Sequence, residues 1–308
     1  MSFGIQTLVA FWTLLAGFGL FGCSVNRIAV NTTAGVLSEA ESSTRAYFDW
    51  ESAGVAAPSG IMQLEGLHTV SPDNDELSLT LLKAYMAYAY GWVMDSYEEA
   101  NQRGDFALAD HHKQRAYLMY SRARDLGVRV LRHRDEHLPE MLNKDPKTLR
   151  AYLDKQFDAD DMPALFWSMM AWTSAINNSP NLDDLADMSA LRVIAEWVVK
   201  RDPGYEDAGA LVFLGGFEAS FPVQLGGHPE KGKAYFEQAM KLTHRHNHIL
   251  LINYATLYAV AVQDRALYLS LLHAILEAGD QGAAYRLSNK VARRRAVRAL
   301  ARTDELFF

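Results

Sequence analysis

Apolar residues recur along the chain at intervals of three and four positions rather than two, so the pattern predicts helices throughout. No segment shows the sustained apolar and polar alternation of a half-buried strand. Proline, glycine and capping residues mark the expected helix ends, as at 71–74, 202–204 and 226–230. The pattern predicts twelve helices, with boundaries placed to about three residues, at 33–50, 58–70, 74–101, 104–136, 146–155, 162–178, 183–201, 206–221, 229–242, 248–261, 264–278 and 281–303.

The short predicted loops favour neighbouring helices that pack as antiparallel hairpins. Tetratricopeptide hairpins carry a small residue, an aromatic residue four positions later and a second small residue three positions after that. Two sets fit this spacing, and a glycine on the helix before the second set completes its hairpin: Ala116, Tyr120 and Ala123; Gly232, Phe236 and Ala239; and Gly215. The spacing is lost around 191–203, so we expect an all-α array of degenerate tetratricopeptide-like hairpins, closed into a single bundle or solenoid of about twelve helices.

The start of the chain has the features of a removable leader. Residues 8–22 are apolar apart from Thr13 and end at Cys23, the single cysteine. Leu20, Gly22 and Cys23 have the spacing of a bacterial lipobox, in which a peptidase cuts just before the lipidated cysteine. The first six residues lack the usual Lys or Arg, and the alternative is an uncleaved transmembrane anchor. We expect removal of residues 1–22, acyl chains on Cys23, and one domain over 23–308.

The residue after the cysteine bears on where a lipidated chain would lie. Ser24 stands there rather than an aspartate, which in a Gram-negative cell favours transfer to the periplasmic face of the outer membrane. Two or three acyl chains hold a protein stably at a membrane, whereas one chain holds it only marginally. With one cysteine in the whole chain, disulfides within the domain are excluded, and its stability must come from an apolar core.

Composition is that of a folded protein, with 49% hydrophobic and 22% charged residues. The net charge of −7 disfavours binding to nucleic acids, whose phosphates it would repel. The one basic cluster lies on the last predicted helix, and we interpret it as a solvated helix face: Lys290, Arg293, Arg294, Arg295, Arg298 and Arg302.

The chain offers few candidates for catalysis or metal binding. His133 and His137, with Glu136 between them, match an inverted zinc-protease spacing, but the neighbouring arginines would repel a dication and Pro139 ends the helix. His244, His246 and His248 alternate across a helix junction and need no metal there. No phosphate-binding glycine loop, serine elbow or cysteine–histidine pair is present in the sequence. We therefore predict no enzyme activity, no metal and no cofactor.

Several helices carry aromatic and amide side chains on one face. If the array encloses a central cavity, these side chains are our candidates for lining it, and the alternative is that each belongs to the core. The candidates are Tyr85, Tyr88 and Trp92 on one helix, Trp167 and Asn177 on a second, and Asn253 and Tyr254 on a third.

Three separate segments resemble the TatT family of lipoproteins, which are associated with TRAP transporters, the tripartite periplasmic carriers driven by ion gradients. They are MPALFW at 162–167 with AW at 171–172, LGGHPEKGKAYFEQA at 225–239 and LSNKVARRRA at 287–296. The resemblance implies a non-enzymatic accessory protein with a tetratricopeptide-like fold that binds the substrate-binding subunit of the transporter. It also implies a cavity or pore through the protomer and assembly as a homotrimer.

Two functions of different classes remain open at this point. The first is a transport accessory that docks on a substrate-binding protein and shelters or passes a small, partly apolar ligand. The second is a structural adaptor for envelope proteins that binds no small molecule, a common use of tetratricopeptide-like arrays. A continuous cavity lined by Trp, Tyr and Asn would favour the first function, and a filled core would favour the second.

Overall fold

The computed structural model describes residues 27–307 apart from 28, 34, 38 and 221–226. Within this part of the chain the regular structure is helical and no strand forms, which confirms the all-α prediction. The leader and Cys23 lie outside the described residues, so the lipidation site stays a prediction. None of the described helices combines the length and the apolar character that crossing a membrane requires.

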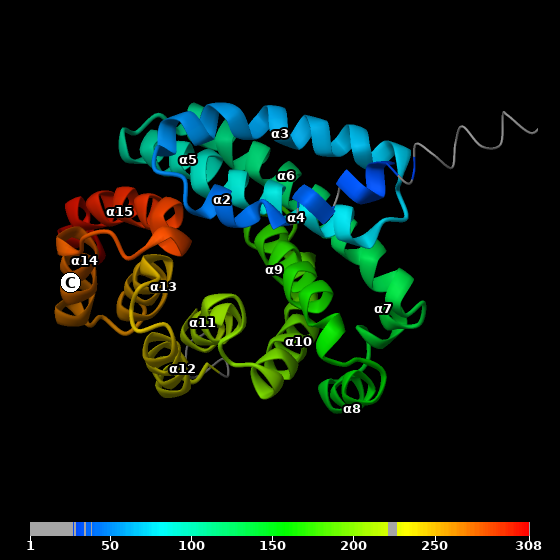
Figure 1. Cartoon of the computed structure of the whole chain (residues 1–308). Coiled ribbons are helices and arrows are strands. Elements are labelled where there is room, and N and C mark those ends of the chain that lie inside the picture. The colour runs from blue at the N-terminus through cyan, green and yellow to red at the C-terminus, as the bar shows by residue number, and fades with distance from the viewer. Residues whose placement is uncertain (1–26, 28, 34, 38, 221–226, 308) are drawn as a thin grey trace, which may run out of the picture.

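The helices follow one another around a closed path (Figure 1). In chain order they are α2 (Glu41–Arg45), α3 (Trp50–Val70), α4 (Asp75–Tyr88), η1 (Ala89–Val93), α5 (Met94–Gln102), α6 (Phe106–Arg134), α7 (Leu138–Met141), α8 (Pro146–Gln156), η2 (Ala159–Asp161), α9 (Met162–Asn178), η3 (Leu182–Asp187), α10 (Met188–Arg201), α11 (Tyr205–Ser220), α12 (Pro229–Leu242), α13 (His248–Asn253), η5 (Tyr254–Ala259), α14 (Arg265–Glu277), η6 (Ala283–Tyr285), α15 (Arg286–Ala301) and α16 (Thr303–Leu306). Helices α3 to α6 form one layer, α9 and α10 lead away from it, and α11 to α15 return to it.

The first long helix differs from its prediction, which placed a break before 58. Asp49 caps α3 by accepting hydrogen bonds from the backbone N–H groups of Glu51 and Ser52, so the helix begins at Trp50 and Pro58 lies inside it. Pro58 leaves the carbonyl of Gly54 without its helical donor. At Gly54 the indole of Trp92 approaches so closely that an added Cβ would lie 2.2 Å from its Nε1.

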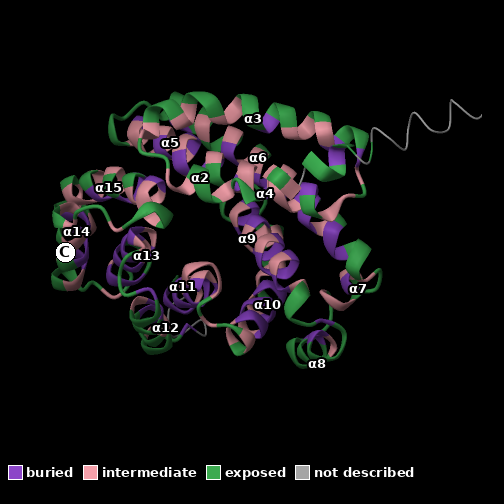
Figure 2. Cartoon of the chain, in the orientation of Figure 1, coloured by how far each residue is buried: buried purple, intermediate pink, exposed green. Residues whose placement is uncertain are grey.

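Apolar packing runs continuously around the path. One cluster of buried residues joins α6, α8, α9, α10 and α11, a second joins α11 to α15, and a third joins α3, α4, η1, α6 and α9. Trp167 and Met170 pack against both the first and the third cluster, and Val199 and Tyr235 pack against both the first and the second. Figure 2 shows the buried residues on the faces that the helices turn toward one another.

The helices of the best-matched hairpin approach each other closely because glycines stand at the contact. A Cβ on Gly215 of α11 would lie 2.7 Å from the ring of Phe236 on α12, and a Cβ on Gly232 would lie 2.9 Å from the carbonyl oxygen of Gly215. Phe236 and Ala239 are fully buried. The residues of the other expected set, Ala116, Tyr120 and Ala123, are buried on α6 within the third cluster.

The two ends of the array are joined by arginines of α15 that bind carboxylates of α5. Arg294 Nη2 lies 2.9 Å from Asp95 Oδ2, and Arg298 pairs with both Asp95 and Glu98. Arg295 donates to the carbonyl of Tyr90 at 3.0 Å, and its guanidinium lies 3.7 Å from that ring centroid. The interpretation of this basic cluster as a solvated face is therefore wrong for these three arginines, which close the array.

We expect Asp95→Asn to lower the free energy of unfolding by about 3 kcal/mol, because Asp95 is only 2% exposed and its loss leaves half-buried guanidinium groups short of a counter-charge. Urea unfolding followed by circular dichroism measures the change. The matched control is Asp304→Asn, whose partner Arg265 and whose own side chain are exposed, and it should cost less than about 1 kcal/mol. Equal effects of the two substitutions would show that the contact between α15 and α5 does not hold the array closed.

Candidate functional site

A group of charged and aromatic side chains gathers where α2, α4 and α9 meet the start of α11. We call it the central cluster, and it consists of Glu41, Arg45, Lys83, Trp167, Glu206 and Asp207. These residues come from four separate segments of the chain, so the closed path of helices is what brings them together.

The cluster alternates cations and carboxylates. Arg45 Nη2 lies 2.6 Å from Glu41 Oε1 and 2.8 Å from Glu206 Oε2, while Lys83 Nζ lies 3.0 Å from Glu41 Oε2 and 3.8 Å from Glu206 Oε1. Burial raises the pKa of Glu41, but hydrogen bonds from Arg45 and Lys83 outweigh burial and hold that pKa below its usual value. Each glutamate of the cluster therefore lies between the same two cations.

Trp167 joins the apolar core to this charged network. Its indole N–H donates to Glu206 Oε1 at 3.3 Å, and the ammonium of Lys83 lies 5.2 Å from its ring centroid, within range of a cation–π interaction. Phe166 packs edge-to-face with Trp167 and with Tyr205. The site thus places an aromatic ring beside paired charges, an arrangement suited to a ligand with both an apolar and a polar part.

The start of α11 has an unusual backbone. Glu206, Asp207 and Ala208 all have left-handed φ angles, of 44°, 56° and 62°, although none is glycine. Such a conformation costs roughly 1–2 kcal/mol for each residue. It turns the side chain of Glu206 toward Arg45 and that of Asp207 toward Tyr285, whose hydroxyl donates to it at 3.1 Å. Burial raises the pKa of Asp207 above its usual value, since its hydrogen bond from Tyr285 and the charge of Arg45 only partly compensate.

Helix α2 is attached to the rest of the protein by charge rather than by apolar packing. It has five residues and none of them is buried. Besides the pairs of Glu41 and Arg45, the carbonyl of Ala46 just after the helix accepts a hydrogen bond from Arg286 of α15 at 3.2 Å. We call residues 41–49 the strap, because they run from α15 across to α4 and α11.

The other candidates for cavity lining have their contacts outside the central cluster. Tyr85 donates to Glu65, which is also held by Arg122 at 2.7 Å, so it links α3, α4 and α6. The ring of Trp92 stacks on Tyr88 and on Trp50, and its indole N–H donates to the carbonyl of Trp50 at 3.0 Å.

The remaining candidates lie elsewhere on the path. Asn177 is exposed near the end of α9, and Asn253 is half-buried at the end of α13. Tyr254 is 1% exposed and its ring stacks on Phe236 at 4.7 Å, which is core packing of the second apolar cluster. Of the seven candidates, Trp167 is the one whose described contacts place it in the central cluster.

Sequence reasoning missed the charged members of the site. Glu41, Arg45 and Glu206 lie in short or boundary segments where periodicity carries no information about partners. The histidine groups behave as helix-end residues: His133 lies 2.9 Å from Asp75 Oδ1, His137 is exposed, and His244 and His246 stand in a turn. Within the described residues no group of three or more His, Cys, Asp or Glu side chains is arranged to hold a metal ion.

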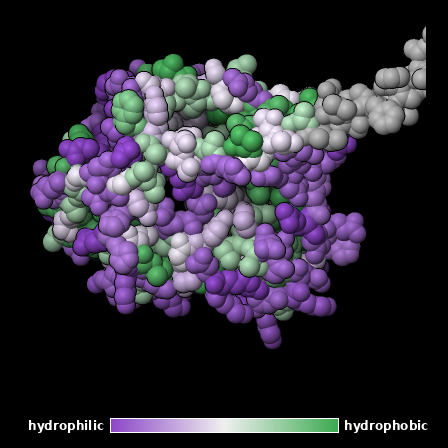
Figure 3. All heavy atoms as spheres, viewed as in Figure 1, coloured by the Kyte–Doolittle hydropathy of each residue, from purple (hydrophilic) through white to green (hydrophobic). Residues whose placement is uncertain are grey.

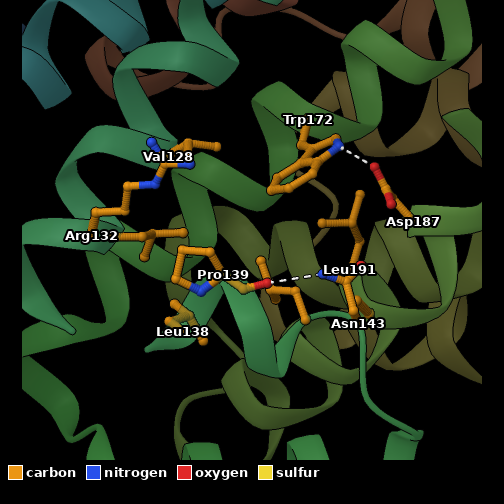
Figure 4. Close-up of a pocket in the computed structure, with 11 residues that line it drawn as sticks. Val128, Arg132, Leu138, Pro139, Asn143, Trp172, Asp187 and Leu191 are labelled. Atoms are coloured by element: carbon orange, nitrogen blue, oxygen red, sulfur yellow. Dashed lines mark hydrogen bonds between the residues drawn. The ribbon is translucent and has the colours of Figure 1, made fainter. Parts of the chain in front are cut away.

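A separate pocket of about 220 Å³ lies outside the cluster, between α6, α7, α9 and α10 (Figure 4). Its wall is mainly apolar, with Leu131, Leu138 and Leu191, and Trp172 lies along it with its indole N–H on Asp187 at 3.1 Å. The pocket has room for one small group, and its single aromatic donor is already occupied by that carboxylate.

We expect Arg45→Gln to speed amide hydrogen exchange in 41–49 about fivefold to tenfold, because the strap loses the cation that joins Glu41 to Glu206 and its helix has no buried residue of its own. Mass-spectrometric exchange measures this, and Arg103→Gln, which breaks an exposed pair on α5, is the control. Because the pKa of Glu41 is lowered, the attachment should be present at neutral pH and lost as pH falls through that lowered pKa. Unchanged exchange in Arg45→Gln would mean that other contacts hold the strap.

Comparison with known proteins identifies the family to which the chain belongs. Residues 48–307, from the end of the strap through α16, match the sequence model described as TRAP transporter T-component (TAtT). No curated protein sequence matches the chain. The match confirms the resemblance of the three segments and includes Trp167, Glu206 and the closing arginines. The chain belongs to the TRAP transporter T-component family.

Proposed function

We propose that the protein is a periplasm-facing lipoprotein that serves as an accessory of a TRAP transporter, binds its substrate-binding subunit, and shelters or passes a small, partly apolar ligand. The family match over most of the chain is the observation that carries the transporter connection. Lipidation of Cys23, an address at the periplasmic face of the outer membrane, and assembly as a homotrimer are parts of the same proposal.

The central cluster is the place in the protomer that we propose for the ligand. Trp167 offers an apolar face beside the ammonium of Lys83, and Glu206 accepts from its indole. A ligand with an apolar body and a polar end would contact both at once. Glu41 and Glu206 are each paired with Arg45 and Lys83, which suits non-covalent recognition of a polar group.

The second candidate function is an adaptor for envelope proteins without a small ligand. It is favoured by Tyr254, a cavity-lining candidate that instead packs as filled core against Phe236. On the face in Figure 3, hydrophilic side chains cover most of the surface and hydrophobic ones form small separate patches. Val55 and Met62 of α3 are 82% and 75% exposed and offer apolar side chains to a partner.

The transporter connection is tested with residues 23–308 carrying Cys23→Ser, immobilised and mixed with periplasmic extract of the source cells. We expect a TRAP substrate-binding protein to be retained in a fixed ratio, as identified by mass spectrometry and then by titration calorimetry with the purified partner. Retention of other envelope proteins without that subunit would support the adaptor.

The ligand site is tested with Trp167→Phe, which keeps an aromatic ring but removes the N–H donor to Glu206. We expect affinity for the substrate that co-purifies with the partner subunit to fall about fivefold to tenfold, with binding of the partner itself unchanged. Trp172→Phe removes an equivalent bond to Asp187 in the separate pocket and is the control. Equal affinity in both variants and wild type would exclude the central cluster as the ligand site.

A further inference from the structure

A groove of about 380 Å³ is lined by residues none of which belongs to the central cluster. Its walls come from the end of α14 and the chain after it, from the first two turns of α15, and from His248 at the start of α13. Phe48 of the strap stands at its edge. The volume is within the range of pockets that bind small molecules, about 300–1,000 Å³.

The cations at this groove are left over after the array has been closed. Arg294, Arg295 and Arg298 face α5 and η1, whereas Arg286, Lys290 and Arg293 follow one another at helical spacing on a different face of α15. Arg286 is paired with Asp280 at 2.8 Å. Among the described residues, Lys290 and Arg293 form no ion pair, although Asp49 and Asp280 are close enough to Lys290 to interact at longer range.

The floor of the groove is apolar. Ile275 is 1% exposed and His248 is 4% exposed, and burial, together with the nearby charges of His246 and Arg293, lowers the pKa of His248 so that its ring is neutral at pH 7. Phe48 also lines the groove, and its side chain is 67% exposed. The groove thus combines an apolar floor with two cations that form no ion pair, while Asp280 also lines it and Arg293 donates to the carbonyl of Leu276 beside Ile275.

From this juxtaposition we infer that the groove binds a small amphipathic anion. Its negative head group lies between Lys290 and Arg293, and its short hydrocarbon tail lies on Ile275 and beneath Phe48. The groove carries three cations, Arg286, Lys290 and Arg293, against one carboxylate, Asp280, and on a chain of net charge −7 this local excess of positive charge favours an anion. Binding of this anion requires no transporter partner, so it stands or fails separately from the proposed function.

An anion bound in the groove would also contact the strap. Phe48 belongs to the strap, and Arg286, which lines the groove, also donates to the carbonyl of Ala46 within the strap. A bound tail that packs under Phe48 adds an apolar contact to a segment otherwise held by charge. Binding in the groove should therefore slow amide exchange in 41–49 as well.

The test is a calorimetric titration of residues 23–308 carrying Cys23→Ser with sodium decanoate, kept below the concentration at which it forms micelles. We expect saturable binding of one decanoate, about tenfold weaker in Lys290→Ala and in Arg293→Ala, and weaker in Phe48→Ala, whose side chain is exposed and whose loss should not unfold the protein. Decanol, which lacks the charge, should bind at least tenfold more weakly than decanoate.

Two control variants distinguish binding in this groove from binding elsewhere on the protein. Arg265→Ala on α14 removes an exposed cation outside the groove, and Trp167→Phe alters the central cluster, so both should bind decanoate like the wild type. The inference is overturned if decanoate does not bind, or if the groove variants and Arg265→Ala bind it equally. Binding to phosphatidylglycerol vesicles that depends on Lys290 without binding of free decanoate would also overturn it, and would make the groove a membrane contact.

Discussion

The buried carboxylate of Asp95 is the contact on which the closed array depends. An array of hairpins whose units touch only their neighbours has two free ends and an open curvature. Here Arg294 and Arg298 of the last long helix reach Asp95 on α5, while Arg295 binds the backbone of η1. A buried charge tolerates few arrangements of its partners, because any slip leaves it uncompensated in a poorly solvated place. Charge therefore fixes the register in which the ends meet, while the apolar clusters supply the packing around the rest of the path.

Closure also determines what faces the middle of the path. Lys83 on α4, Trp167 on α9 and Glu206 at the start of α11 are far apart in sequence and come within contact only because the helices bend round to meet. The left-handed turn at 206–208 is tolerated because its side chains have partners on other elements. The strap is different in kind, since its helix contributes charge to the cluster but buries nothing, and segments of that kind open at low free energy. The central cluster thus joins residues of long packed helices to a strap whose helix has no buried residue.

The sequence predicts the helices well where a buried face repeats, as in the hairpin of α11 and α12, because periodicity reports burial directly. Small residues such as Gly215 and Gly232 also signal a close approach, since few other reasons favour them within a helix. Prediction from the sequence fails where a residue's role depends on a partner far away along the chain. Arg294 and Asp95 are 199 residues apart, so nothing local distinguishes a closing arginine from a solvated one. Pro58 led to a wrong helix start for a different reason. The Asp49 cap starts the helix at Trp50, and the helix continues through Pro58 despite the missing hydrogen bond.

The last long helix divides its charges between two faces that the sequence does not separate. At about 100° per residue, three sets of residues on α15 point in three different directions. Ala292 and Ala296 face the core, Arg294 and Arg298 face α5, and Lys290 and Arg293 face the groove beside Phe48. Cations spread over two of these faces look like a uniform basic helix in the sequence, yet one set is neutralised by carboxylates and the other is not. Lys290 and Arg293 form no ion pair among the described residues, and Arg293 donates only to the carbonyl of Leu276, so this set remains for a ligand once the closing contact has taken the arginines that the fold itself requires.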